Sequence, residues 1–358
     1  MPTYVLEGGS GATLPAKPLV LRVQGPGESE ARLEARQDGT PDPTAMSPQP
    51  GVLVLPRVTG PVDVRVIPAG GRTFPSGTVI ALSAAIEQHG DPDPERAVMQ
   101  GVDLSGLTGR ELLRIEPRDG QVRLTALGVV VDSPLPALAA KARDIARELL
   151  GVEWVPDSDA SALVIRVDGS ASMRSLVADG SVGAALEVLA GISRVTSADL
   201  PVTAEAGSPN PTVVQADSVG ALPLEVHQAL SALPLLTGFR SAGRVGGAGR
   251  TSLCVVSDSV PADLPVDVPV ALAVIASPQA REVIAPRAPA GTGWIPVGER
   301  GERSAYAWLS EDQLALREAV RGLLRAIIPP GSGLRAQLDE SGNDFDGGAD
   351  QTMLRARF

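Results

Sequence analysis

The sequence predicts two fold classes in one chain: a β-rich N-terminal domain, sandwich-like or barrel-like, followed by an α/β domain with a doubly wound, mostly parallel sheet. Short apolar or alternating runs separated by Gly and Pro fill residues 1–134, whereas strand-like runs alternate with helical segments over residues 158–328. The 358 residues include 39 glycines and 32 prolines but only 3% aromatic residues, so the cores must be built from Val, Leu, Ala and Ile. Such cores suit β-rich and α/β packing.

The N-terminal domain is predicted from runs of strand length that are typical of antiparallel sheets. In order, these runs are TYVLEG, PLVLRV, ARLEARQ, GVLVLP, VDVRVIP, TVIALSAAI, LLRIEP and QVRLTALGVVV. The Asp-Gly pair in PRDGQV predicts a hairpin turn between the last two runs. The segment QHGDPDPERAVMQG interrupts the pattern and predicts a surface loop with a helical turn.

A helix that links the two domains is predicted within residues 135–157. The segment PALAAKARDIARELL has apolar residues at helical spacing, begins with Pro136 and ends before Gly151. The α/β domain then follows as SALVIRV, SLVADGSVGAALEVLAGI, LPVTAEAG, PTVVQAD, PLEVHQALSAL, TSLCVVS, VPVALAVIAS and SEDQLALREAVRGLLRAII. Ser310 is the predicted N-cap of the last helix. Residues 329–358 have few apolar side chains and an acidic centre, which predicts a disordered tail.

Charge and residue counts disfavour several functional classes. Lys and Arg total 31 against 42 Asp and Glu, and a net charge of −11 disfavours nucleic acid and anionic membranes as partners. Without a leader-like start or an apolar run of about 18 residues, the protein is expected to be soluble and cytoplasmic.

The cysteine and histidine content offers few catalytic or zinc-binding residues. Cys254, the only cysteine, lies in an apolar run and is expected to be a buried structural thiol. The two histidines, His89 and His227, are far apart in the sequence. With no zinc motif, nucleophile elbow or phosphate-binding loop, the sequence predicts a protein that is not an enzyme.

Side chains with oxygen donors follow the most apolar strand of the α/β domain. Asp168 ends the run ALVIRV, and Ser170 and Ser172 follow at alternating positions. Ligands of open parallel sheets bind beyond the carboxyl ends of strands, and one carboxylate with two hydroxyls suits Mg²⁺ or Mn²⁺. A second apolar run, TSLCVVS, also ends at a carboxylate, Asp258. A solvated connection between a strand and a turn is the other interpretation of the Asp-x-Ser-x-Ser pattern.

This order of residues resembles the von Willebrand factor type A (vWA) family, a Rossmann-like fold with a metal ion-dependent adhesion site (MIDAS). The resemblance is sharpest in VIRVDGSASM. It implies that Ser170 and Ser172 bind the ion directly and that Asp168 and Asp258 bind it directly or through water. It also implies that Thr237, on a middle loop, is the mobile ligand.

The middle-loop ligand has rivals, because the sequence departs from the family pattern there. Thr237 precedes Gly238 where the family usually has Gly-Thr, so Thr212 and Thr251 are alternatives. The fourth strand is followed by Ser-Asp-Ser where the family usually has Thr-Asp-Gly. A site that has lost strong metal binding is therefore an alternative to a working one.

The resemblance implies a non-catalytic protein-binding module in which an acidic residue of a partner completes the coordination of the metal, as an adaptor in bacterial signalling or assembly. One alternative is a vWA subunit of a chelatase-type ATPase complex. The other is a metal-independent structural or assembly protein.

Two further features suggest partners. The end DQTMLRARF resembles the phosphothreonine tails of actinobacterial signalling proteins, which implies a kinase and a forkhead-associated domain as partners of Thr352, although a solvated tail residue is the simpler interpretation. Trp154, Trp294 and Trp308 are expected to pack at the edge of the second domain. The segment GTGWIPVGERGER is interpreted as a loop, and partner contact by an exposed Trp294 within it is the alternative.

Overall fold

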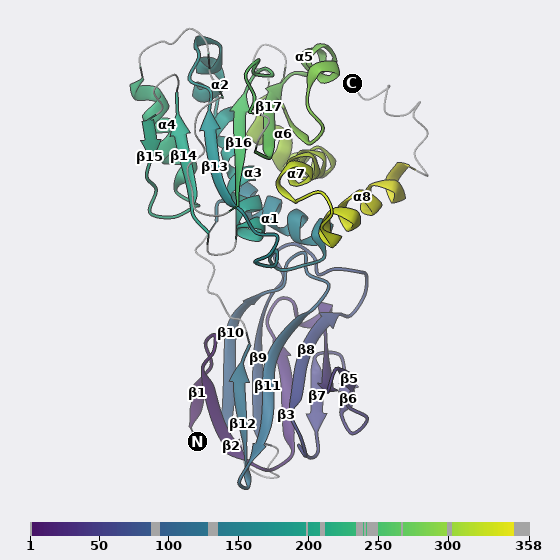
Figure 1. Ribbon diagram of the computed structural model, residues 1–358. Coiled ribbons are helices and arrows are strands. Elements are labelled where there is room, and N and C mark those ends of the chain that lie inside the picture. The colour runs from purple at the N-terminus through teal and green to yellow at the C-terminus, as the bar shows by residue number, and fades with distance from the viewer. Residues whose placement is uncertain are drawn as a thin grey trace. The chain divides into compact units, whose positions relative to one another are not determined.

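The chain divides into two compact units, Met1–Asp132 and Ser133–Phe358 (Figure 1). The computed structural model describes residues 2–86, 94–127, 135–197, 200–207, 212–233, 239, 241, 250–265, 268–298 and 303–346, apart from the side chains of 341–346. Among its described residues, the first unit contains strands and one 3₁₀ turn, Glu28–Glu30, whereas the second contains strands and helices. The coarse prediction of a β-rich half followed by a mixed α/β half is therefore confirmed.

The first unit is a sandwich of two six-stranded sheets, ordered β1-β10-β9-β3-β7-β6 and β2-β12-β11-β8-β4-β5. The strands are β1 Thr3–Val5, β2 Gly11–Pro15, β3 Leu19–Gln24, β4 Ala31–Gln37, β5 Thr40–Pro41, β6 Met46–Gln49, β7 Val52–Leu55, β8 Val62–Pro68, β9 Val79–Ile86, β10 Arg96–Asp103, β11 Arg110–Arg118 and β12 Gln121–Ala126. Only the pair β1–β10 is parallel among the described strand pairs of this unit. Alternate residues of both sheets point inward and form one core, as in β4, where Ala31, Leu33 and Ala35 are buried.

The predicted Asp-Gly hairpin is confirmed, and one predicted loop is wrong. Asp119 and Gly120 both have positive φ, 46° and 76°, as a type I′ turn between β11 and β12 requires. The segment predicted as a loop with a helical turn, QHGDPDPERAVMQG, contains most of strand β10, and its residues 88–93 lie outside the described residues. A β-bulge between Met99 and Val102, with Gly101 at a φ of 67°, breaks the alternation that would have identified this strand.

The second unit is built on a six-stranded sheet ordered β15-β14-β13-β16-β17-β18 (Figure 1). Its strands are β13 Ala162–Val167, β14 Val202–Ala206, β15 Thr212–Val214, β16 Thr251–Ser257, β17 Val270–Ala276 and β18 Thr292–Pro296. The edge strand β15 is antiparallel to β14, and the other pairs are parallel. The chain fills one side of β13 first and then crosses to the other side at β16, which is the arrangement of a doubly wound sheet.

Helices flank this sheet unequally. The helices are α1 Ala137–Leu150, α2 Arg174–Ala178, α3 Ser181–Thr196, α4 Leu222–Ala232, α5 Pro278–Ile284, α6 Ala305–Glu311, α7 Gln313–Ile327 and α8 Gly333–Asp346. Residues 163, 165 and 167 of β13 share a core with apolar residues of α1, α3, α4, α6 and α7. Val164 belongs to the opposite face, where α5 and connecting segments pack.

Within the described residues, no single helix is long and apolar enough to cross a bilayer. The bent pair Ala171–Ala178 and Ser181–Thr196 reaches that length only when its two helices are taken together.

The predicted linking helix is part of the second unit's core. Helix α1 ends where predicted, with Gly151 in the left-handed conformation at φ 65°, and its apolar side chains pack in the core that also contains α3. At Gly191 of α3 an added Cβ would lie 2.9 Å from Cβ of Ala142 and would also meet the carbonyl oxygen of Ala139. Only glycine permits so close an approach of the two helices, which explains why α1 packs on α3.

Glu187 on α3 caps the start of α1. Pro136, the N-cap residue, has no side-chain acceptor, and the backbone N–H groups of Leu138 and Ala139 donate hydrogen bonds to the Glu187 carboxylate. Burial nevertheless raises the pKa of Glu187, against the smaller opposing effect of these two hydrogen bonds.

The raised pKa of Glu187 predicts a pH dependence of stability. Because the folded-state pKa lies above the unfolded value, the group favours folding below its ordinary pKa, and this contribution is lost as pH rises through the folded-state pKa. A Glu187→Gln variant retains a carbonyl acceptor without the titration. We therefore expect its melting temperature to fall less than that of the wild type as pH rises from about 4 to 7; parallel curves would contradict the assignment.

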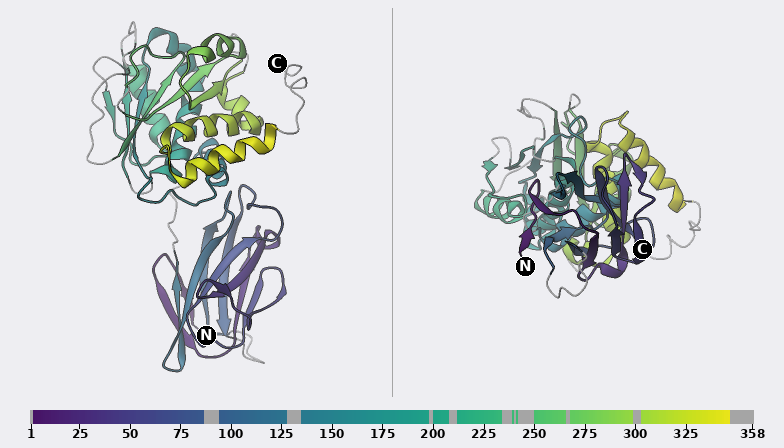
Figure 2. Two further views of the ribbon diagram at one scale, coloured as in Figure 1. Left: turned by 45° about the vertical axis from the view of Figure 1, so that its right-hand side comes forward. Right: turned by 90° about the horizontal axis from the view of Figure 1, so that it is seen from below.

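Three predictions near the C-terminus are corrected. Ser310 lies inside α6, and Asp312 caps α7 instead, accepting the N–H of Ala315 at 3.0 Å. The tail predicted to be disordered contains helix α8, which lies beside α1 and α7 (Figure 2) and buries Leu338. The segment around Trp294, interpreted as a loop, contains the edge strand β18.

Candidate metal centre

The candidate site lies where the strand order of the second unit reverses. Asp168 follows the last residue of β13, and its N–H continues the pairing with β16 by donating to the carbonyl of Val256 at 2.9 Å. The chain leaves the carboxyl end of β13 toward β14 and later returns on the other side in β16. Parallel α/β sheets place their ligands in the crevice beyond such strand ends.

The Asp168 carboxylate is buried and fixed by two donors. Its side chain is 3% exposed in the folded chain. Oδ1 accepts the N–H of Ser170 at 2.7 Å, and Oδ2 accepts the hydroxyl of Ser257 at 2.8 Å. The hydroxyls of Ser170 and Ser172 lie 3.0 Å apart. The structure therefore brings together three of the predicted ligands and adds Ser257, which the sequence reasoning missed.

Backbone packing fixes the course of the loop after Asp168. An added Cβ on Gly169 would lie 2.8 Å from Cα of Gly207, and the N–H of Gly207 donates to the carbonyl of Val167 at 3.2 Å. The chain therefore turns tightly against the end of β14. It then continues through the 3₁₀ turn Ala171–Met173 into α2, and this turn carries Ser172 next to Ser170.

Sheet register places the other predicted ligands. Val167 pairs with Val256, so Asp258 leaves β16 at the same edge of the sheet as Asp168. Thr251 pairs with Ala162 at the opposite end of these strands, and six residues of extended chain, about 20 Å, separate it from the site. As a metal ligand, Thr251 is therefore excluded.

Thr212 and Thr237 have different outcomes. Thr212 pairs with Ala206 and so lies at the correct edge of the sheet, but on β15, two strands and about 10 Å from β13. Thr237 lies outside the described residues, so its role as the third-loop ligand stays a prediction.

The donor set around Asp168 fits a hard cation. Carboxylate and hydroxyl oxygens are the ligands that Mg²⁺ accepts, with water in the remaining positions. Each carboxylate oxygen has two lone pairs, so Asp168 can retain both hydrogen bonds and still face an ion or its water. Among the described residues no three His, Cys, Asp or Glu side chains form a cluster, so the site suits a ligand set rich in hydroxyls and not a zinc centre.

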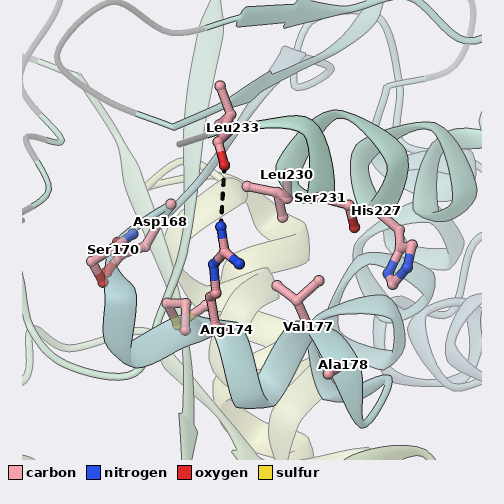
Figure 3. A pocket seen from close by; sticks show the side chains of 11 residues that line it. Asp168, Ser170, Arg174, Val177, Ala178, His227, Leu230, Ser231 and Leu233 are labelled. Atoms are coloured by element: carbon pink, nitrogen blue, oxygen red, sulfur yellow. Dashed lines mark hydrogen bonds between the residues drawn. The ribbon is translucent and has the colours of Figure 1, made fainter. Parts of the chain in front are cut away.

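A cavity of about 340 Å³ opens beside this loop (Figure 3). Its lining comes from the loop after β13, from α2 and from the C-terminal half of α4 with Leu233. Arg174 lies between the loop and α4, and its Nη2 donates to the carbonyl of Leu233 at 3.2 Å. His227 is exposed on α4 at the far side of the cavity.

The other residues singled out from the sequence have structural roles or lie elsewhere. Cys254 is fully buried in β16, and burial raises the pKa of its thiol to about 12, which makes it unreactive as predicted. Trp294 is partly buried under Arg281, and the exposed tryptophan is Trp154, at 42%. His89 and Thr352 lie outside the described residues.

No protein family model matches the sequence, and no curated protein is significantly similar to it.

Proposed function

We propose that the second unit is a vWA-type domain whose MIDAS-type site binds Mg²⁺ or Mn²⁺ and thereby captures an acidic residue of a partner protein, without catalysis. The observation that carries this proposal is the Asp168 carboxylate, held by Ser170 and Ser257 at the strand-order reversal. The order of the candidate residues supports it, since Asp168 follows the first strand of the sheet along the chain and Asp258 follows the fourth. A role in the cytoplasm, as an adaptor in bacterial signalling or assembly, belongs to the same proposal.

The residues of the site have distinct roles in this proposal. Ser170 and Ser172 offer hydroxyl oxygens to the ion, while Asp168 and Asp258 offer negative charge directly or through water. Thr237 is the proposed ligand from the middle loop. When bound, the ion supplies the positive charge that attracts a carboxylate of the partner. The hydrogen bonds from Ser170 and Ser257 hold Asp168 in one orientation, which lowers the cost of ordering the site when the ion binds.

Calorimetric titration of the chelator-treated full chain with Mg²⁺ and with Mn²⁺ tests the proposal. We expect one saturable site for each ion. A chain that binds neither ion, with its melting temperature unchanged by either, would overturn the metal-dependent function.

A metal-independent assembly protein is the second candidate, and one observation favours it. Both oxygens of Asp168 have hydrogen-bond donors within the chain, so this buried carboxylate has polar partners that do not depend on an ion. Under this candidate, chelation leaves partner binding intact, whereas the metal-dependent proposal requires its loss.

A further inference from the structure

We propose that the cavity beside Ser170 is a subsite for a second acidic side chain, in which Arg174 binds another carboxylate of the same partner segment. This inference rests on the proposed function, because it takes the metal as the primary contact. It makes the partner segment doubly acidic, with one carboxylate on the ion and one on Arg174.

The surroundings of Arg174 carry this inference. Its guanidinium offers five N–H donors in a planar fork, and the carbonyl of Leu233 accepts from one nitrogen, Nη2. No carboxylate of the described residues forms an ion pair with Arg174. Asp168 is the one acidic side chain among the described residues that line the cavity, and its two oxygens accept hydrogen bonds from Ser170 and Ser257. Arg174 is thus an exposed cation, positioned by a backbone contact, whose other donors face the cavity (Figure 3).

The shape and lining of the cavity suit an acidic side chain with methylene groups. Its volume of about 340 Å³ is near the lower end of the roughly 300–1,000 Å³ of small-ligand sites, which fits a side chain better than a large cofactor. Met173, Val177 and Leu230 supply an apolar wall. Ser231 and His227, on α4, supply polar groups across from Arg174 (Figure 3). Glutamate, with two methylene groups and a carboxylate, matches this combination.

The position of the cavity connects it to the metal centre. Asp168, Gly169 and Ser170 line the cavity, and Ser170 is also a proposed metal ligand. A short peptide that places one carboxylate on the ion can therefore place a neighbouring residue in the cavity. The net charge of −11 disfavours binding of acidic segments to the rest of the protein surface. The bound ion and Arg174 are therefore the two cationic contacts that would select a doubly acidic partner.

The test selects short random peptides displayed on phage with the full chain in Mg²⁺, using the wild type, Arg174→Gln and the control Arg287→Gln. Arg287 is also exposed, but it lies in the 3₁₀ turn Ala285–Arg287 and does not line the cavity. We expect the wild type and the control to enrich peptides with two acidic residues, and Arg174→Gln to enrich peptides with one.

An enriched peptide is then synthesised with each glutamate or aspartate replaced in turn by its amide. We expect Arg174→Gln to bind the parent peptide about tenfold more weakly than the wild type does. For the peptide in which the acid that contacts Arg174 has been replaced by its amide, we expect Arg174→Gln and the wild type to bind equally well. Three results would each overturn the subsite. Arg174→Gln and the wild type could bind the parent peptide with equal affinity, or Arg174→Gln could lose the same affinity relative to the wild type for every amide peptide. The selection could also enrich no acidic peptides.

Calorimetry with Mg²⁺ alone separates this inference from the proposed function. If Mg²⁺ binds but the effect of Arg174→Gln does not depend on any one acid of the peptide, the subsite is contradicted and the metal centre is supported. If no ion binds and that dependence is still seen in chelator, the metal centre is contradicted and Arg174 is supported as a carboxylate site.

Discussion

Replacing Asp168 by asparagine is expected to weaken Mg²⁺ binding at least about 100-fold, since even outer-shell substitutions at metal sites cost 10- to 100-fold. Asparagine keeps an oxygen that accepts the Ser170 N–H and an amide that can donate to the Ser257 hydroxyl, so the two hydrogen-bonded contacts survive. The variant removes the negative charge alone. Its melting temperature without metal should therefore stay close to that of the wild type, and calorimetric titration measures the loss of affinity.

Asp157→Asn is the matched control for this experiment. Asp157 is exposed in the segment before β13, at the opposite end of the strand from Asp168. We expect its Mg²⁺ isotherm to match that of the wild type. If Asp168→Asn and Asp157→Asn bind Mg²⁺ equally well, the ion binds elsewhere and the proposed metal centre is wrong.

Asp168→Ala is a more disruptive variant, because it removes the carboxylate that accepts the Ser170 N–H. We expect it to lower the free energy of unfolding by about 1–3 kcal/mol.

Replacing Glu205 by alanine is expected to lower the free energy of unfolding of the second unit by about 3 kcal/mol. Nε of Arg166, on β13, donates to Oε2 of Glu205 on the neighbouring strand β14 at 2.5 Å, with side chains only 6% and 18% exposed. Nη1 of Arg166 also donates to the carbonyl of Ser241, whose N–H and hydroxyl donate to Asp263 at 3.0 Å. Loss of Glu205 removes a closely bound carboxylate from a buried guanidinium. The melting temperature should fall by about 6–12 °C.

Glu318→Ala is the matched control, because Glu318 forms an exposed ion pair. Its carboxylate lies 3.7 Å from Arg281, with side chains 52% and 46% exposed, and solvent screens such a pair. We expect a change within about 0.5 kcal/mol. Equal melting temperatures for the two variants would show that the Arg166–Glu205 pair contributes no more than a surface pair.

The sequence by itself determined the features that depend on neighbours along the chain. Alternating apolar residues identified strands such as β4, and helical spacing with Gly151 identified α1. The Asp-Gly pair specified the turn at residues 119–120, because both residues tolerate positive φ. The position of Asp168 after an apolar strand predicted a site at the end of β13, which is where the strand order reverses.

The tertiary structure alone decided which distant residues meet. The sequence did not predict strand β10, because its bulge disrupts the alternation of apolar and polar residues. It did not predict α8, because residues 333–346 are mostly polar and Leu338 becomes buried through packing against other elements of the unit. Sheet register excluded Thr251 and brought the Ser257 hydroxyl to Asp168, 89 positions away in sequence. The cavity with Arg174 also exists only because α4 packs beside α2. Local periodicity is encoded residue by residue, but pairing register and helix packing depend on contacts across the whole unit, and those contacts build the site.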